Sequence, residues 1–296
     1  MRVGILDVGS NTARLLVADV RGSRLEPVTT GRAHLGLGAE IAERGTLRRK
    51  TIAAAARVCR KHADRARELG VERAQVIVTA PGRQGTASAA LVGALHEATR
   101  LPVRILAADD EGQLAYEGAV ASLSGDQPSR IAVVDVGGGS TELVVGPPGF
   151  GPMWLRSLDL GSLRLTRLAL PSDPPTDREL ARARAAARSA FAALDPPRPV
   201  LALATGGSAR ALARLVGRVY DHDDAAAAVA LLARRRSGKV ARDVGIDPSR
   251  AGTLLAGALL LGEASRTLGR PLRLARGGLR EGAALALAAE TVARAA

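Results

Sequence analysis

Residues 3–17 read VGILDVGSNTARLLV, and residues 131–145 read IAVVDVGGGSTELVV. In both stretches an apolar run ends at an aspartate, Asp7 or Asp135, and a glycine-rich turn leads into a second apolar run. Glycine permits positive φ angles and close approach of the backbone to a ligand, and successive exposed N–H groups form an anion-binding concavity. The repeated pattern therefore predicts two strand–turn–strand hairpins, each with a phosphate-binding turn.

Each copy taken alone also fits an ordinary β-hairpin whose glycines serve the turn. The two copies lie 128 residues apart and have Asp-Val-Gly at the same position relative to their apolar runs, which favours the phosphate interpretation. Neither copy is a P-loop or a dinucleotide fingerprint, because G-x-x-x-x-G-K-[ST] is absent and no G-x-G-x-x-G opens a helix after a strand. The aspartate at each turn predicts a site for hydrated Mg²⁺ or a positioned water, although Asx hydrogen bonds within the turn would explain it as well.

Length and composition indicate a globular protein with two cores. The chain has 296 residues, 47% of them hydrophobic and 24% charged, which is enough for two domains. The apolar stretch 253–262 is far shorter than the ~20 residues of a membrane span, and the charged Asp7, Arg14 and Asp19 argue against a signal peptide. The lone Cys59 excludes an internal disulfide and a cysteine-based zinc site. We expect a cytoplasmic protein with no membrane partner.

The formal net charge of +13 predicts attraction of polyanions. Only three basic residues are lysines, so part of this charge reflects an arginine-rich composition typical of GC-rich coding. An aromatic content of 2% leaves few platforms for stacking single-stranded nucleic acid, and no nucleic-acid recognition motif is present, so no specific nucleic-acid partner is expected. Residues 234–236 are all arginine, followed by Lys239 and Arg242; they fit a solvated face, or a basic track for distal phosphates.

Strand and helix signals alternate along the chain and restart once, which predicts a duplicated α/β architecture. The turn-forming residues 125–129 predict a boundary between domains 1–125 and 126–296, with the terminal helix packing back on the first domain. A ligand would then bind in the cleft between the two halves. The predicted strands are 2–20 with their turn, 24–36, 75–79, 102–106, 130–136, 141–146, 154–160, 200–204 and 272–275. The predicted helices include 177–193, 208–217, 224–235, 238–244, 249–267 and one from 279.

Further segments fall in a recognisable order: DVGSNT (7–12), VTAPGR (78–83), ADDEGQLAYEGAV (108–120), DVGGGSTEL (135–143), SLDLGSLRLT (157–166), ATGGSARALARL (204–215), RAGTLLAGALLL (250–261) and GGLREGAAL (277–285). Together they resemble the exopolyphosphatase and guanosine pentaphosphate phosphohydrolase (Ppx/GppA) family over essentially the whole chain. The resemblance implies the duplicated actin/Hsp70/sugar-kinase-like (ribonuclease H-like) fold, with two domains and an interdomain active-site cleft. The chain departs from the family pattern at Asp110, at Gly112-Gln113, at His34 and at Gly252.

The resemblance also implies roles for individual residues. Glu111 falls on the catalytic glutamate, which activates water, and Arg83 falls on a phosphate-binding arginine. From the residues alone, Glu111 fits better as a first-turn acid that favours the helix dipole, and Arg83 fits better as a solvated arginine. Asp110 fits a helix cap as well as it fits a Mg²⁺ ligand. The candidate catalytic residues are Glu111, Asp135 and Asp7. The candidate Mg²⁺ ligands are Asp7, Asp135, Asp110 and Glu142. The candidate substrate-binding residues are Gly9, Ser10, Asn11, Thr12, Arg83, Gly137, Gly138, Gly139, Ser140, Gly206, Gly207 and Ser208.

Two remaining local patterns have structural interpretations. Residues 205–208 predict a third glycine turn that opens a helix capped by Ser208. His222 with its acidic neighbours fits a loop and helix start better than a metal site, and Cys59 fits the apolar stripe of a helix better than a nucleophile.

The sequence thus predicts a Mg²⁺-dependent exopolyphosphatase that releases orthophosphate from the end of inorganic polyphosphate, with water activated by Glu111. Guanosine pentaphosphate (pppGpp) is the alternative substrate, and a non-catalytic polyphosphate or alarmone sensor is the alternative function. A kinase of the same superfamily is a further rival, but the Asp110-Glu111 helix start and the Arg83 loop favour water as acceptor. A homodimer is left open.

Overall fold

The computed structural model describes residues 1–125 and 127–295, except for the side chains of residues 292, 294 and 295. Asp126, part of the predicted boundary turn, and Ala296 lie outside the described residues. Among the helices that are described, none is both long and apolar enough to cross a membrane.

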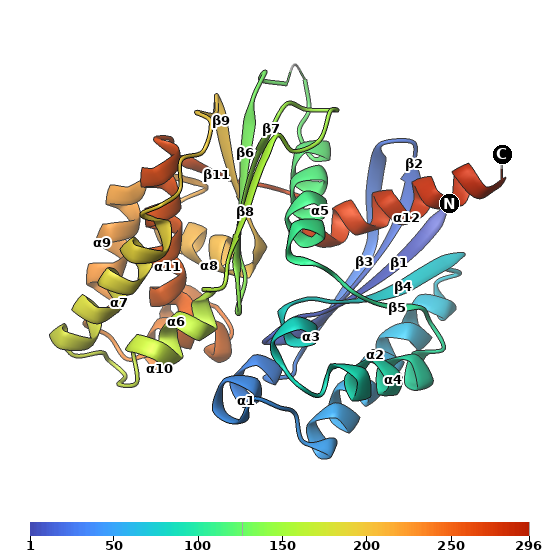
Figure 1. Ribbon diagram of the computed structural model, residues 1–296, viewed down its shortest axis with the longest axis horizontal. Coiled ribbons are helices and arrows are strands. Elements are labelled where there is room, and N and C mark those ends of the chain that lie inside the picture. Colours follow the sequence, from blue (N-terminus) through green and yellow to red (C-terminus); the bar gives the residue numbers. More distant parts are fainter. Residues whose placement is uncertain (126, 296) are drawn as a thin grey trace. The chain divides into compact units, whose positions relative to one another are not determined.

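The chain forms two compact units, each built on one mixed β-sheet (Figure 1). Unit 1 contains Met1–Ala121 together with the C-terminal residues from Gly277 on. Unit 2 contains Ser122–Arg276. The last helix of the chain is therefore part of the first unit.

The sheet of unit 1 has the strand order β3-β2-β1-β4-β5. Strand β1 pairs antiparallel with β2 and parallel with β4. Alternate side chains face opposite sides, so Leu6 and Val8 pack with α2 and α4 whereas Val3 and Ile5 pack with α12. The elements are β1 (Arg2–Val8), β2 (Thr12–Arg21), β3 (Arg24–His34), α1 (Leu37–Arg44), α2 (Arg49–Glu68), β4 (Arg73–Val78), α3 (Ala80–Gln84), α4 (Ser88–Thr99), β5 (Val103–Ile105), α5 (Ala108–Ala121) and α12 (Leu279–Ala295).

The sheet of unit 2 repeats this pattern with the order β8-β7-β6-β9-β11-β10. Strand β6 pairs antiparallel with β7 and parallel with β9. Helix α11, buried along most of its length, packs with β6 and β9 in the main core of this unit. The elements are β6 (Ile131–Val136), β7 (Thr141–Gly146), β8 (Trp154–Leu158), α6 (Ser162–Ala169), α7 (Asp177–Phe191), β9 (Leu201–Thr205), α8 (Gly206–Val216), β10 (Val219–Tyr220), α9 (His222–Leu232), α10 (Ser237–Val244), α11 (Pro248–Leu268) and β11 (Leu272–Leu274).

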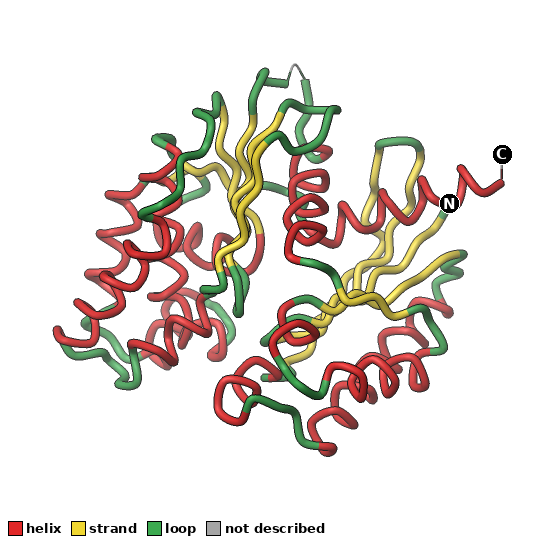
Figure 2. Tube along the Cα trace, in the orientation of Figure 1, coloured by secondary structure: helices red, strands yellow, loops and turns green. Residues whose placement is uncertain are grey.

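Both units therefore share a central hairpin followed by a third antiparallel strand, with a parallel strand on the other side. Figure 2 shows the strands of each unit in yellow, with helices in red. The predicted duplicated α/β architecture is confirmed. Two eight-residue helices, α1 and α6, are missing from the sequence prediction, which extends the third strand to residue 36 in one unit and expects only a strand and a turn in the other.

Candidate functional site

The first glycine turn, residues 9–12, joins β1 to β2. The Gly9 N–H donates to the Thr12 carbonyl at 3.0 Å and closes the turn. The carbonyls inside the turn are engaged by the chain around the start of α1; the Gly38 N–H, for example, donates to the Ser10 carbonyl at 2.7 Å. Within the described part of the chain, the N–H groups of Ser10 and Asn11 meet no acceptor. The turn thus keeps its donors available while its acceptors are satisfied.

The second glycine turn, residues 137–140, is built in the same way. The Gly137 N–H donates to the Ser140 carbonyl at 3.0 Å. The first amides of α6 engage the turn's carbonyls: Ser162 donates to Gly137 at 2.9 Å, and Leu163 donates to Gly138 at 3.0 Å. The Gly138 N–H has no acceptor among the residues that the structure describes. In both units, an eight-residue helix after the third strand neutralises the turn's carbonyls, which leaves a concavity of N–H donors suited to an anion.

The glycines of the second turn do not adopt a left-handed backbone, and a neighbouring glycine, Gly161, packs closely against the turn. Neither Gly9 nor any of residues 137–139 has a positive φ. A Cβ on Gly161 would lie 2.5 Å from the carbonyl carbon of Gly138 and 2.6 Å from the Gly139 nitrogen. The backbone before α6 therefore lies directly on the turn. Among the predicted site glycines, positive φ occurs only at Gly206 (+83°).

Asp7, at the end of β1, lies among positive charges. It faces Arg14 across the antiparallel β1–β2 pair, so the two side chains project from the same face. Burial raises the pKa of Asp7, and the charges of Arg14 and Arg280 partly offset that effect. Arg280 belongs to α12; its side chain is 13% exposed, and Nη1 donates to the Leu15 carbonyl at 3.4 Å. We add Arg280 to the candidate site. The GGLREG segment was the signal for it, although no chemical role follows from that segment alone.

Asp135, the equivalent residue in unit 2, faces a second carboxylate instead. Glu142 lies opposite it across the β6–β7 pair and is 1% exposed. The Ser157 hydroxyl donates to Glu142 Oε1 at 2.9 Å. A Cβ on Gly206 would lie 2.3 Å from Asp135 Oδ1, so the carboxylate lies directly against the start of α8. Two carboxylates on one face of a sheet are suited to a divalent cation, because Mg²⁺ is held by few carboxylates and several waters.

Glu111 and Arg83 form an ion pair in unit 1. Glu111 lies in the first turn of α5 and is 8% exposed. Arg83 of α3 approaches it with 2.9 Å between Nη1 and Oε2, and the same nitrogen donates to the Leu106 carbonyl at 2.7 Å. Thr79, the N-cap of α3, lies beside the first turn, since its Oγ1 would be 3.7 Å from a Cβ on Gly9. A largely buried acid–base pair therefore stands one short helix away from the first turn.

Helix α5 is held in place by a contact between glycines. A Cβ on Gly118 of α5 would lie 2.1 Å from the Gly278 carbonyl oxygen. A Cβ on Gly282 of α12 would lie 1.9 Å from the Leu114 carbonyl oxygen. The two helix backbones therefore touch, as the crossing of α5 and α12 in Figure 1 shows. This contact sets the position of the helix that carries Glu111.

Asp110 and Ser208 differ from the other candidates in their surroundings. Asp110 pairs with Arg104 at 2.6 Å on the surface of unit 1. Ser208 is the third residue of α8 and is 1% exposed, and its hydroxyl makes a long hydrogen bond of 3.5 Å to the Ser162 hydroxyl. The prediction that Ser208 caps this helix is wrong, because the N-cap is Thr205 and α11 packs against Ser208: a Cβ on Gly257 would lie 3.0 Å from the Ser208 Cβ. Gly207, which lies between Gly206 and Ser208, is the second residue of α8.

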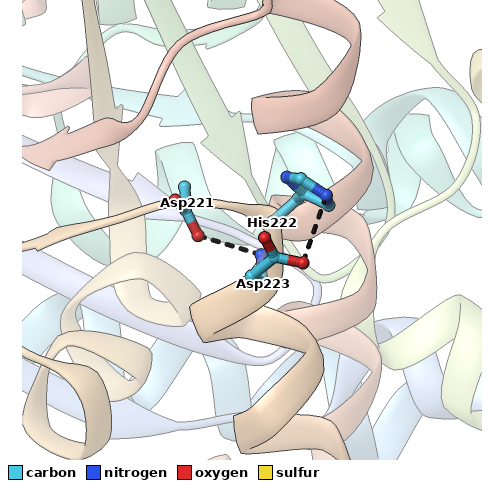
Figure 3. Close-up of side chains that lie close together, drawn as sticks. All are labelled: Asp221, His222 and Asp223. Carbon is cyan, nitrogen blue, oxygen red and sulfur yellow. Dashed lines mark hydrogen bonds and ion pairs between the residues drawn. The ribbon is translucent and has the colours of Figure 1, made fainter.

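Asp221, His222 and Asp223 form a group whose ligand atoms lie within 4.8 Å of one another (Figure 3). Asp221 Oδ1 accepts from the N–H groups of Asp223 at 2.9 Å and Asp224 at 3.1 Å, which caps α9. His222 Nε2 lies 3.3 Å from Asp223 Oδ1, and both side chains are exposed. Helix capping explains the group, as the sequence predicts. Cys59 is fully buried, and burial raises the pKa of its thiol to about 12, which fits a core residue and not a nucleophile.

Comparisons with known proteins agree with this architecture. The profile of the Ppx/GppA phosphatase family matches residues 16–290. Exopolyphosphatase 1 of Mycobacterium leprae is 30% identical over 285 residues, which cover 90% of this chain and 84% of that protein. The Aquifex aeolicus member of the Ppx/GppA family has a similar structure, with a TM-score of 0.83, 24% identity and 98% of each chain covered. An exopolyphosphatase from Cytophaga hutchinsonii has a TM-score of 0.85 at 18% identity, with 95% of this chain and 96% of that chain covered. The predicted actin/Hsp70/sugar-kinase-like fold is confirmed.

Proposed function

Because the chain belongs to the Ppx/GppA phosphatase family and is a phosphoanhydride hydrolase of the exopolyphosphatase type, we propose that it removes the terminal phosphate of inorganic polyphosphate with the help of Mg²⁺. The observation that carries this proposal is the construction of the two glycine turns. Each presents backbone N–H donors without an acceptor, while its carbonyls are already bonded. Phosphate oxygens are strong acceptors that match such donors.

The phosphate contacts come from the turns and from the arginine between them in the chain. In unit 1 the Ser10 hydroxyl is buried and has no partner among the described residues, so it can add a donor to the Ser10 and Asn11 amides. Arg83 supplies a planar fork for phosphate oxygens. The remaining proposed contacts are Gly9, Thr12, Gly137, Gly138, Gly139, Ser140 and the start of α8 at Gly206, Gly207 and Ser208.

Glu111 is the proposed base. Its carboxylate is shielded from solvent and oriented by Arg83, which fits a group that holds a water for attack on phosphorus. The new bond forms between the water oxygen and the terminal phosphorus, and the bond from that phosphorus to the bridging oxygen breaks. Glu111 accepts the water proton, and the bridging oxygen leaves with the shortened chain as its charged end.

Asp135 and Glu142 fit Mg²⁺ better than Asp7 does. Both are carboxylates on one face of the unit 2 sheet, whereas the residue opposite Asp7 is Arg14, and its other charged neighbours are Arg280 and Glu281. In that position Mg²⁺ would supply neutralisation of phosphate charge. Asp7 then serves to order the arginines beside the first turn. Asp110 contributes less, because Arg104 already pairs with it.

A matched pair of substitutions in the first turn of α5 tests the proposal. Glu111→Gln removes the base, and Asp109→Asn removes an exposed charge from the same helix turn. We expect Glu111→Gln to lower the rate of phosphate release by about 10²-fold or more while polyphosphate binding persists. Asp109→Asn should remain close to wild type. Equal activity of the two variants would refute the role of Glu111.

The substrate is tested by phosphate release from polyphosphate, guanosine pentaphosphate and ATP, with Mg²⁺ and with a chelator. The proposal requires the highest kcat/KM on polyphosphate and loss of release with the chelator. A higher kcat/KM on guanosine pentaphosphate would assign the chain to the other activity of its family. Binding without release of phosphate from any of the three would identify a sensor.

A further inference from the structure

A basic hollow lies in unit 2, outside the residues of the proposed site. It is open to solvent and has a volume of about 680 Å³. Five of its lining residues are cations, and only one is an anion. The cations are Arg234, Arg235, Arg236, Lys239 and Arg242, and the anion is Asp173. We call the concavity that these residues line the basic hollow. A net charge of +4 follows from five positive and one negative side chain.

Most of these cations have no counter-charge in the described residues. Arg235 pairs with Asp243 at 3.5 Å. Arg234, Arg236, Lys239 and Arg242 are exposed and make no ion pair with any carboxylate that the structure describes. Four uncompensated cations around one concavity repel one another, and they raise the local concentration of anions.

The one carboxylate that lines the hollow, Asp173, already accepts two hydrogen bonds. Asp173 accepts from the Ser237 N–H at 2.8 Å and from the Ser237 hydroxyl at 2.6 Å. These bonds fix the start of α10 and therefore the turn between α9 and α10, on which Arg234, Arg235 and Arg236 lie. Gly238 leaves room for Arg242, whose Nη1 would be 4.0 Å from a Cβ there. The cations are thus arranged on a defined backbone.

The hollow is connected to the second glycine turn by one short helix. Helix α6 begins on that turn, with Leu163 donating to the Gly138 carbonyl, and ends at Ala169. Asp173 follows four residues later. Thr166 of α6 and Val240 of α10 line a common smaller cavity of about 120 Å³, so the two helices are neighbours (Figure 1). The eight residues of α6 span about 12 Å, at ~1.5 Å per residue.

We propose that the basic hollow binds a distal stretch of a phosphate chain whose nearer part is held at the second glycine turn. The inference rests on the proposed function for the identity of the ligand, a phosphate chain, but it concerns a separate set of protein residues. Arginine and lysine side chains match a linear polyanion at several points, and binding then gains affinity by releasing counterions. A phosphate chain that follows α6 from the turn must be longer than ~12 Å, so we expect long chains to contact the hollow and tripolyphosphate, with three phosphates, not to depend on it.

Nucleic acid fits the hollow less well than a phosphate chain. No aromatic side chain lines the basic hollow, so bases have no platform on which to stack. A phosphate chain needs only cations, because every unit of it carries charge. The three arginines of the turn between α9 and α10, together with Lys239 and Arg242 of α10, supply such a track.

The test is a quadruple variant, Arg234→Gln, Arg236→Gln, Lys239→Gln and Arg242→Gln. Its control removes the same number of exposed cations from the outer face of α2 in unit 1: Lys50→Gln, Arg57→Gln, Arg60→Gln and Lys61→Gln. The measured quantities are Kd for long-chain polyphosphate as a function of salt, and kcat/KM for long-chain polyphosphate and for tripolyphosphate.

We expect the hollow variant to raise Kd for long chains at least tenfold and to lower the slope of log Kd against log salt by about 3, at ~0.7 per cation lost. Its kcat/KM on tripolyphosphate should stay within twofold of wild type, and the α2 variant should change Kd by less than threefold. An equal loss in both variants, an equal loss on tripolyphosphate, or no loss would overturn the proposal.

Two further outcomes separate this inference from the proposed function. If the protein releases no phosphate from polyphosphate, the proposed function fails, and the binding measurements still decide on the hollow. If a single-stranded DNA oligonucleotide binds wild type more tightly than polyphosphate does and loses affinity in the hollow variant, the hollow is a nucleic-acid site and the proposal is wrong.

Discussion

Replacing Gly282 with alanine tests how the position of Glu111 is set. The added Cβ would lie 1.9 Å from the Leu114 carbonyl oxygen of α5, whereas an ordinary contact requires at least 3.4 Å. The helices must therefore separate by about 1.5 Å, the difference between these two distances. Neither partner can relieve the contact by rotating a side chain, because the facing atom is backbone.

Gly93→Ala is the matched control. Gly93 lies in the exposed face of α4 in the same unit, and a Cβ there would meet nothing within 4 Å. Alanine in a helix interior is favoured over glycine by about 1 kcal/mol, so Gly93→Ala should raise the free energy of unfolding. Overpacking of a close contact costs about 3 kcal/mol at the upper end of its usual range. Gly282→Ala should therefore be about 2 kcal/mol less stable than wild type once the same ~1 kcal/mol gain is subtracted.

The two variants should also differ in activity. A shift of α5 by more than an ångström moves Glu111 relative to Arg83 and the first turn, and misplacement of about 1 Å costs about 10²-fold in rate. Urea unfolding followed by circular dichroism gives the stability, and phosphate release under conditions where both variants are folded gives the rate. If Gly282→Ala proves as stable and as active as Gly93→Ala, the helix contact does not position the base. If only stability falls, the contact is structural alone.

Two further predictions concern the aspartates. Burial raises the pKa of Asp7, so at pH values above that raised pKa the ionised carboxylate destabilises the folded state. Below the unfolded-state pKa of ~3.9, Asp7 is protonated in both the folded and the unfolded protein, and this destabilisation is absent. Asp7→Asn should therefore be more stable than wild type at pH 7, with a difference that disappears below about pH 3.9 in a series of unfolding curves; equal stabilities at pH 7 would contradict this. Gly206→Ala combines left-handed strain of ~1–2 kcal/mol with displacement of Asp135, whereas Gly217→Ala, at φ +94° with nothing within 4 Å, carries the strain alone. Only Gly206→Ala should lose phosphate release at saturating Mg²⁺, and similar rates in the two variants would exclude a role for Asp135.

The hairpins were predictable because they depend on local pattern. Each has an apolar run that ends at an aspartate before a glycine turn, and this pattern places Asp7 and Asp135 at equivalent ends of their strands. The helices that support the turns were not predictable. Their N-caps, Gly36 and Gly161, make no side-chain capping bond, and their first amides are satisfied by turn carbonyls at a distance in the chain. A helix stabilised in this way has no start signal of its own.

Residues brought together by tertiary packing were also out of reach. Arg280 bonds to the Leu15 carbonyl across 265 positions of sequence. The pairing of Glu111 with Arg83 has no local signature, and only the family resemblance assigned a role to either residue. The Ser208 error has the same origin, since the residue has the chemistry of a cap but α11 packs over the place where it stands. Local chemistry therefore predicted the turns, and packing decided which side chains serve them.

The two units share a frame but differ in charge at equivalent positions. Seven residues after its aspartate, unit 1 has Arg14 and unit 2 has Glu142, each directly opposite that aspartate. After the parallel strand beside the hairpin, unit 1 has a short helix that carries Arg83, and unit 2 has the long helix that begins at Gly206. An aspartate among arginines orients cations toward an anion, while an aspartate beside a glutamate attracts a cation. Under the proposed function, unit 1 then supplies the base and unit 2 the Mg²⁺ site, and each unit supplies one phosphate-binding turn.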